Sequence, residues 1–138
     1  MTLAFLNGEP ALADALRALA LANYGHFTSM QVRDGAVQGR DLHIQRLEDA
    51  TQALFGTSLD GESALQQAAH ALASAGLRDA SVRITVFSTR FDYRDPARSV
   101  TPDVLVSLAP RAPIMPFMPR IRPFMPPPAI LLIIFSIC

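Results

Sequence analysis

The chain has 138 residues, of which 50% are apolar, and its 12 basic and 12 acidic side chains give a formal net charge of zero. This length suits a single domain with a modest core. The balanced charge gives no electrostatic reason to expect binding to nucleic acid or to an anionic membrane. All 12 basic residues are arginine. The chain on its own therefore lacks the lysine amine that Schiff-base chemistry requires.

Cysteine and histidine spacing excludes the common metal sites. The only cysteine is Cys138, so neither an internal disulfide nor a Cys-x-x-Cys site can form. The three histidines, His26, His43 and His70, do not have the spacing of a metal-binding motif. A single cysteine fits a reducing compartment, and the N-terminus lacks the basic and apolar regions of a secretory signal. We therefore predict a cytoplasmic protein without a bound metal.

Turn and cap signals divide the first 108 residues into short elements. Asn7-Gly8 and Asp34-Gly35 are turn signals that follow apolar runs. Pro10 suits the first turn of a helix, Asp41 suits a helix N-cap, and Gly76 stands at a C-cap position. The predicted elements in chain order are a strand at 2–6, a helix at 11–21, a hairpin with arms at 26–33 and 36–38, helices at 41–55 and 61–75, and strands at 81–88 and 103–108.

Apolar periodicity assigns faces to these elements. One face of the 26–33 strand carries His26, Thr28, Met30 and Val32. The other face carries Phe27, Ser29, Gln31 and Arg33. The inner stripe of the 41–55 helix consists of Ile44, Leu47, Ala50, Leu54 and Phe55, and that of the 61–75 helix consists of Leu65, Ala68, Ala69 and Leu72. The pattern predicts an α+β fold: a small, mostly antiparallel sheet with two main helices on one face. A bare opposite face would expose apolar surface, so we expect self-association, as in a homodimer.

The last thirty residues have a different composition. Eight of the 20 residues at 109–128 are proline, which excludes a regular helix or ladder, and the apolar run 129–138 follows. Ten residues span about 15 Å as a helix, roughly half of the hydrocarbon thickness, so this run does not cross a membrane. The predicted organisation is a domain at 1–108, an irregular proline-rich segment at 109–128 and an apolar stub at 129–138. A reading-frame change near Pro113 would produce this break; the alternative is a true extended tail.

Three segments carry a resemblance to a known family. They are Asn23-Tyr24-Gly25-His26-Phe27-Thr28-Ser29-Met30-Gln31-Val32-Arg33-Asp34-Gly35, Leu42-His43-Ile44-Gln45-Arg46-Leu47 and Val82-Arg83-Ile84-Thr85-Val86-Phe87. In order and spacing they resemble the small N-terminal domain of the class IV pyridoxal-phosphate aminotransferases, a family that includes branched-chain and D-amino-acid aminotransferases and aminodeoxychorismate lyase. The resemblance covers about residues 1–110.

The resemblance implies roles for individual residues. Arg46 matches the arginine that binds the cofactor phosphate, and a guanidinium suits this role because it forms paired, charge-assisted hydrogen bonds to phosphate oxygens. Phe27 matches an aromatic that lines the substrate pocket, although core packing is the favoured interpretation of this side chain. Arg83 matches a strand arginine that serves a substrate carboxylate or an ion pair. His43 is expected to form a structural hydrogen bond, and Thr28 replaces the family's usual acidic residue.

The family's catalytic lysine lies in a larger C-terminal domain, so this chain has no predicted catalytic residue. We expect a truncated or frameshifted part of an enzyme that acts on amino acids and 2-oxo acids, inactive alone and unable to hold pyridoxal phosphate stably. One alternative is a non-enzymatic interaction module that uses the proline-rich tail. Another is peripheral membrane attachment through residues 129–138, near Arg120 and Arg122. Translation of the other two reading frames after Pro113 would separate the first two hypotheses.

Overall fold

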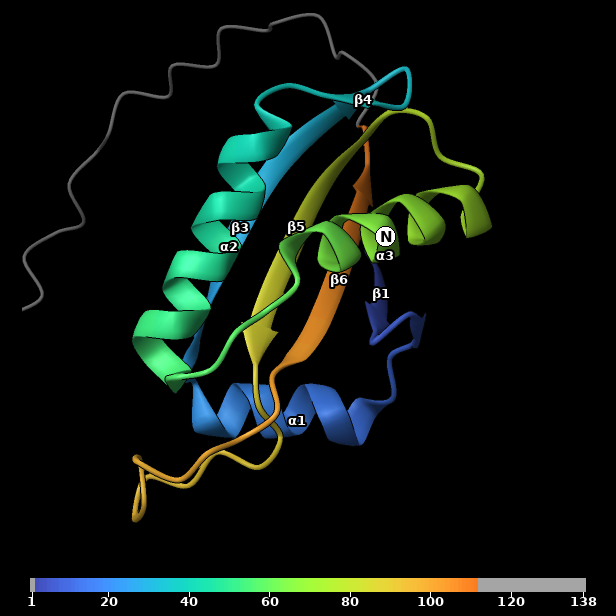
Figure 1. Ribbon diagram of the computed structural model, residues 1–138. Coiled ribbons are helices and arrows are strands. Elements are labelled where there is room, and N and C mark those ends of the chain that lie inside the picture. The colour runs from blue at the N-terminus through green and yellow to red at the C-terminus, as the bar shows by residue number, and fades with distance from the viewer. Residues whose placement is uncertain (1, 112–138) are drawn as a thin grey trace, which may run out of the picture.

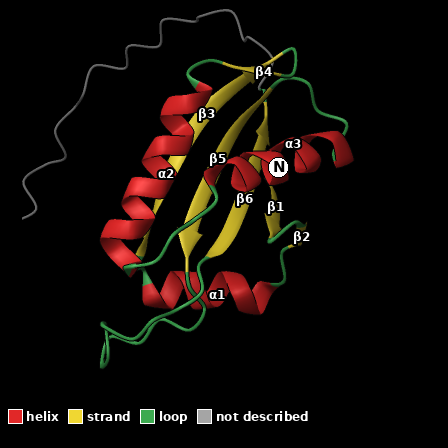
Figure 2. Cartoon of the chain, in the orientation of Figure 1, coloured by secondary structure: helices red, strands yellow, loops and turns green. Residues whose placement is uncertain are grey.

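The structure is a computed structural model that describes residues 2–111 of the chain. It is a six-stranded, fully antiparallel sheet in the order β2-β1-β6-β5-β3-β4, with three helices (Figures 1 and 2). The predicted α+β class is confirmed. Most of the proline-rich segment and the whole apolar stub lie outside the described residues, as do the interactions predicted for them.

The strands match the predicted ones to within two residues, and one was not predicted. Their bounds are β1 Leu3–Leu6, β2 Glu9–Pro10, β3 Gly25–Arg33, β4 Ala36–Val37, β5 Ala80–Phe87 and β6 Asp103–Pro110. The unpredicted strand is β2, whose two residues pair with the end of β1. Pro10 therefore belongs to this strand and not to the first turn of a helix. β6 continues to Pro110, two residues past the predicted end of the domain.

Two helices cover one face of the sheet and the third lies at its end (Figure 1). The covering helices are α2, Arg40–Phe55, which packs on β3, and α3, Gly61–Ser74, which packs on β5 and β6. The third helix is α1, Ala13–Ala22, which has no buried residue. Within residues 2–111, no helix combines the length and the apolar character needed to cross a membrane.

The core lies between the sheet and the two covering helices. The alternating side chains of β5 fill its centre, and Val82, Ile84 and Val86 are each no more than 1% exposed. Leu47 from α2 is completely buried against them. β3 contributes Met30 and Val32 to the core, both from the face predicted to carry His26 and Thr28, so the alternation along this strand is confirmed.

Helix ends and faces differ in three details from the predictions. Asp41 is not the N-cap of α2, because Gly39 occupies that position in a left-handed conformation and its carbonyl accepts from two later amides. Gly76 follows the C-cap residue Ala75 with φ 65°. Ala69, predicted to lie on the inner face of α3, is exposed. The buried residues of α3 are mostly small: Gly61, Ala64, Leu65, Ala68 and Ala71. These alanines let the helix lie close to the sheet.

The face of the sheet that α2 and α3 leave uncovered, here called the open face, is largely polar. Gln31 and Ser81 form a cross-strand hydrogen bond on it, and Arg33 donates to Gln31. The expectation of a bare apolar surface is therefore wrong for the open face of β3 and β5. Its exposed large apolar side chain is Phe27, which is 46% exposed.

Candidate functional site

The predicted site residues meet at the outer edge of β3, where α2 runs beside the strand. β4 pairs only with Val32 and Arg33, so among residues 2–111 the earlier part of β3 has no strand neighbour on that side. Arg46 reaches across from α2, and its Nε donates to the Phe27 carbonyl oxygen at 3.3 Å. This hydrogen bond holds the exposed guanidinium beside the strand edge instead of leaving it free in solvent.

The second arginine lies on the open face of the same strand. The Arg83 guanidinium carbon is 4.4 Å from the centre of the Phe27 ring, a cation–π contact, and its Nε donates to Ser29 Oγ at 3.3 Å. Arg83 and Ser29 are direct cross-strand partners. The interpretation of Phe27 as a core residue is wrong, because its ring lies on the open face beneath a guanidinium. Ser29 was not predicted as a site residue, because no local pattern distinguishes it from other polar residues of the strand.

The site is cationic. Four ion pairs occur within residues 2–111, and their cations are Arg17, Arg40 and Arg78. Arg46 and Arg83 thus have no carboxylate partner in the described part of the chain. Phe27 joins them, because its carbonyl oxygen accepts from Arg46 and its ring contacts Arg83. Two unneutralised guanidinium groups beside an exposed aromatic ring suit a ligand with anionic groups and a flat apolar part.

A partly buried polar network supports this strand from the helix side. His26 Nε2 lies 2.8 Å from Thr51 Oγ1, and Thr51 Oγ1 donates to the Leu47 carbonyl at 2.7 Å. Thr28 Oγ1 and His43 Nδ1 form a second link between β3 and α2 at 2.7 Å. The structural role predicted for His43 is confirmed. Thr51, which is completely buried, was missed because a threonine on an amphipathic helix is normally solvated.

The network fixes the tautomer of neutral His26. Since the Thr51 hydroxyl hydrogen goes to Leu47, the oxygen accepts from His26, and Nε2 carries the hydrogen. The other ring nitrogen, Nδ1, is buried without a partner among the described residues. Burial lowers the pKa of His26, and the positive charge of Arg46 lowers this pKa further. His26 is therefore neutral near pH 7, and its hydrogen bond to Thr51 links β3 to α2.

This arrangement predicts a pH dependence of stability. In the unfolded chain His26 takes up a proton near its ordinary pKa of about 6.5, whereas the folded state resists protonation. The unfolded state then binds more protons, so the free energy of unfolding should fall as the pH drops from about 7 through 6.5 to the lower folded pKa. Urea unfolding at pH values from 7.5 to 5 measures this dependence. The slope of the free energy of unfolding against pH should decrease in His26→Gln and persist in His70→Gln. Equal slopes in the two variants would contradict the assignment of this pH dependence to His26.

Comparison with known proteins shows the family to which the chain belongs. The family model described as amino-transferase class IV matches residues 25–129, which is most of the chain. The protein therefore belongs to the class IV aminotransferase family. The matched residues begin at β3, include Arg46 and Arg83, and continue through the whole proline-rich segment to residue 129. No curated protein gives a significant match.

Two crystal structures have a similar fold. The 4-amino-4-deoxychorismate lyase of Pseudomonas aeruginosa superposes with a TM-score of 0.62 at 23% identity, over 79% of this chain and 40% of that one. The branched-chain amino acid aminotransferase of Escherichia coli gives a TM-score of 0.59 at 16% identity, over the same shares of the two chains. The present chain thus corresponds to about 40% of the length of these proteins.

Proposed function

We propose that this chain forms the small-domain part of a pyridoxal-phosphate enzyme that acts on amino acids, by transamination or lyase chemistry. In this proposal Arg46 binds the cofactor phosphate, while Phe27 and Arg83 border the substrate, with Arg83 facing its carboxylate. One observation supports this proposal: Arg46 and Arg83 both contact Phe27, and neither has a carboxylate partner within residues 2–111. Cytoplasmic location and homodimer formation remain predictions.

The residues of this chain can bind the phosphate group of the cofactor but cannot bind its aldehyde group. The Arg46 guanidinium is exposed, and its Nη groups remain available after Nε bonds to Phe27, which fits an oxyanion. The cofactor supplies an electron sink for amino-acid chemistry once a lysine amine holds it. Arginine cannot replace that amine because its pKa lies above about 12, and the sequence contains no lysine. We therefore propose that a lysine-bearing domain must complete the site and that this chain alone is inactive.

Binding of an aldehyde-free analogue tests the proposed phosphate role separately from catalysis. Pyridoxine 5′-phosphate should bind the full chain weakly and shift the NMR signals of α2 and β3 around Arg46. Arg46→Gln should weaken this binding about tenfold, the loss of roughly 1.4 kcal/mol expected for a charge-assisted contact. Unphosphorylated pyridoxine should bind equally to both forms, since it has no group for the guanidinium.

The matched control is Arg17→Gln, which removes an exposed helix arginine whose guanidinium already pairs with Asp14 at 3.1 Å. This variant should bind like the wild type. Equal affinity of Arg46→Gln and wild type for the phosphate ester would refute the role of Arg46. Turnover of any amino acid by the lysine-free chain with pyridoxal phosphate would refute the proposed need for a second domain.

A further inference from the structure

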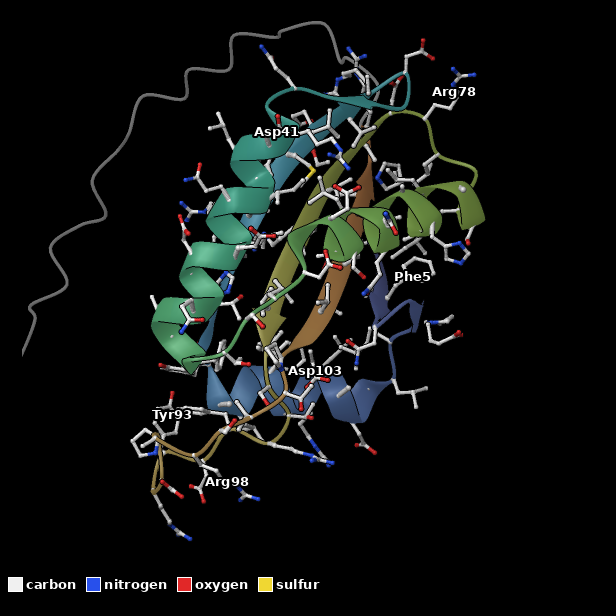
Figure 3. The ribbon with its side chains drawn as sticks, viewed as in Figure 1. Phe5, Asp41, Arg78, Tyr93, Arg98 and Asp103 are labelled. Atoms are coloured by element: carbon white, nitrogen blue, oxygen red, sulfur yellow. The ribbon has the colours of Figure 1, made fainter. Side chains whose placement is uncertain are left out.

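A concave site lies away from Phe27, between two connecting segments. It is a cavity of about 270 Å³ between the α2–α3 connection and the β5–β6 loop. The polar residues that line it are Thr57, Ser58, Arg90, Arg98, Ser99 and Thr101. We call it the loop pocket; it shares no lining residue with the Arg46–Phe27–Arg83 site. In Figure 3, Arg98 and Tyr93 lie on the β5–β6 loop, at the end of the molecule opposite Arg78.

The two cations of the loop pocket form no ion pair within the described residues. The ion pairs within residues 2–111 use other arginines, so neither Arg90 nor Arg98 has a carboxylate partner there. Both side chains are exposed at the pocket, eight positions apart in the loop. Two like charges on the lining of one cavity repel each other, and an anion bound in the cavity offsets that repulsion.

The hydroxyl groups of the pocket are also available. The side-chain hydrogen bonds near the β5–β6 loop involve other groups. The Asp103 carboxylate accepts from Thr89, and Ser88 Oγ accepts from the Arg90 amide. None of the hydroxyls in the pocket forms a side-chain hydrogen bond to another residue of the described range. These hydroxyls belong to Thr57, Ser58, Ser99 and Thr101. Hydroxyl donors beside guanidinium groups match the several acceptor oxygens of a tetrahedral oxyanion.

The loop that carries the arginines is anchored at a point between them. The Phe91 ring stacks on Tyr24 with the ring centres 4.0 Å apart, and Tyr93 meets Phe91 edge to face at 4.9 Å. The Tyr93 hydroxyl donates to the Ala22 carbonyl at the end of α1. These contacts hold the loop before any ligand arrives, which lowers the entropy lost on binding.

We infer that the loop pocket binds a small tetrahedral oxyanion, such as inorganic phosphate, sulfate or the phosphate group of a small ester. Arg90 and Arg98 supply the charge, and the hydroxyls supply the remaining donors. A planar carboxylate or a chloride ion uses fewer of these donors and binds more weakly. This inference does not depend on the proposed enzyme function, because the two sites use different residues.

Titration of the full chain with inorganic phosphate tests the inference. Phosphate and sulfate at constant ionic strength should give saturable shifts, in the millimolar range, of the amide NMR signals of Ser58, Ser99 and Thr101. Arg90→Gln and Arg98→Gln should each weaken binding about tenfold, since each removes one charge-assisted contact. Acetate and chloride should produce shifts that are smaller and do not saturate over the same range.

Two controls separate a specific site from general attraction of anions. Arg94→Gln removes a charge from the same loop at a residue that does not line the pocket, and its phosphate affinity should stay within twofold of wild type. Arg46→Gln should likewise leave the Ser99 and Thr101 shifts unchanged. Equal losses in the Arg94 and Arg98 variants, equal responses to acetate and phosphate, or shifts confined to α2 and β3 would each overturn the inference.

Discussion

Replacing Gly25 by alanine is expected to lower the free energy of unfolding by about 3 kcal/mol, the upper part of the range for forcing extra atoms into a packed site. A Cβ atom at this position would lie 2.3 Å from the Val86 carbonyl oxygen and 3.2 Å from the Phe87 Cβ. Neither neighbour can move freely, because both belong to β5, which is one of the two central strands of the sheet and is hydrogen-bonded on both sides. Urea denaturation monitored by circular dichroism measures the change.

Gly35→Ala is the matched control. Gly35 has φ 76° and no atom within 4 Å of the Cβ position, so alanine there meets only the left-handed backbone penalty of roughly 1–2 kcal/mol. The excess loss in Gly25→Ala reflects the contact with Val86 together with the φ of 156° at residue 25. If the two variants lose the same stability, close approach between β3 and β5 is not what requires glycine at residue 25.

Thr51→Val should destabilise the chain by about 2 kcal/mol, although valine has nearly the same shape as threonine. The substitution removes the hydroxyl that accepts from His26 Nε2 and leaves a buried donor without a partner. His26 would then have neither ring nitrogen hydrogen-bonded within the described residues, because Nδ1 is already unpartnered. Chemical denaturation at pH 7.5 measures the loss while the histidine is neutral.

Thr51→Ser keeps the hydroxyl and removes one methyl group, so it should cost about 1 kcal/mol. The wild type should therefore be the most stable form, Thr51→Ser less stable, and Thr51→Val the least stable. A serine variant that is less stable than the valine variant would show that packing of the methyl group, and not the link to His26, is the main contribution of Thr51. NMR signals of the His26 ring should move in the valine variant and stay nearly fixed in the serine variant.

The strands and long helices could be predicted because local patterns determine them. The alternation along residues 26–33 places Phe27 and His26 on opposite faces, and the structure has them there. The failures have a different origin. Asp41 resembles an N-cap, but Gly39 already provides the left-handed turn into α2, so the aspartate falls in the first helical turn.

The contacts at the candidate site needed the tertiary structure. Nothing local to Phe27 shows that its carbonyl oxygen meets a helix arginine 19 residues later or that its ring lies under Arg83. Thr51 could not be singled out either, because its importance comes from His26, 25 residues earlier. The family resemblance pointed to Arg46, Phe27 and Arg83, and the three-dimensional contacts show that both arginines touch Phe27.

The two strands that end the sheet, β2 and β4, are only two residues long, and β2 ends in Pro10, which has no amide hydrogen to donate. A sheet with such brief outer strands offers little template for another strand to add on, which is how natural proteins avoid fibril growth. Next to β4, the exposed stretch of β3 has α2 and the Arg46 side chain at its margin. Two copies of this chain are therefore not expected to join their sheets edge to edge into a continuous ribbon.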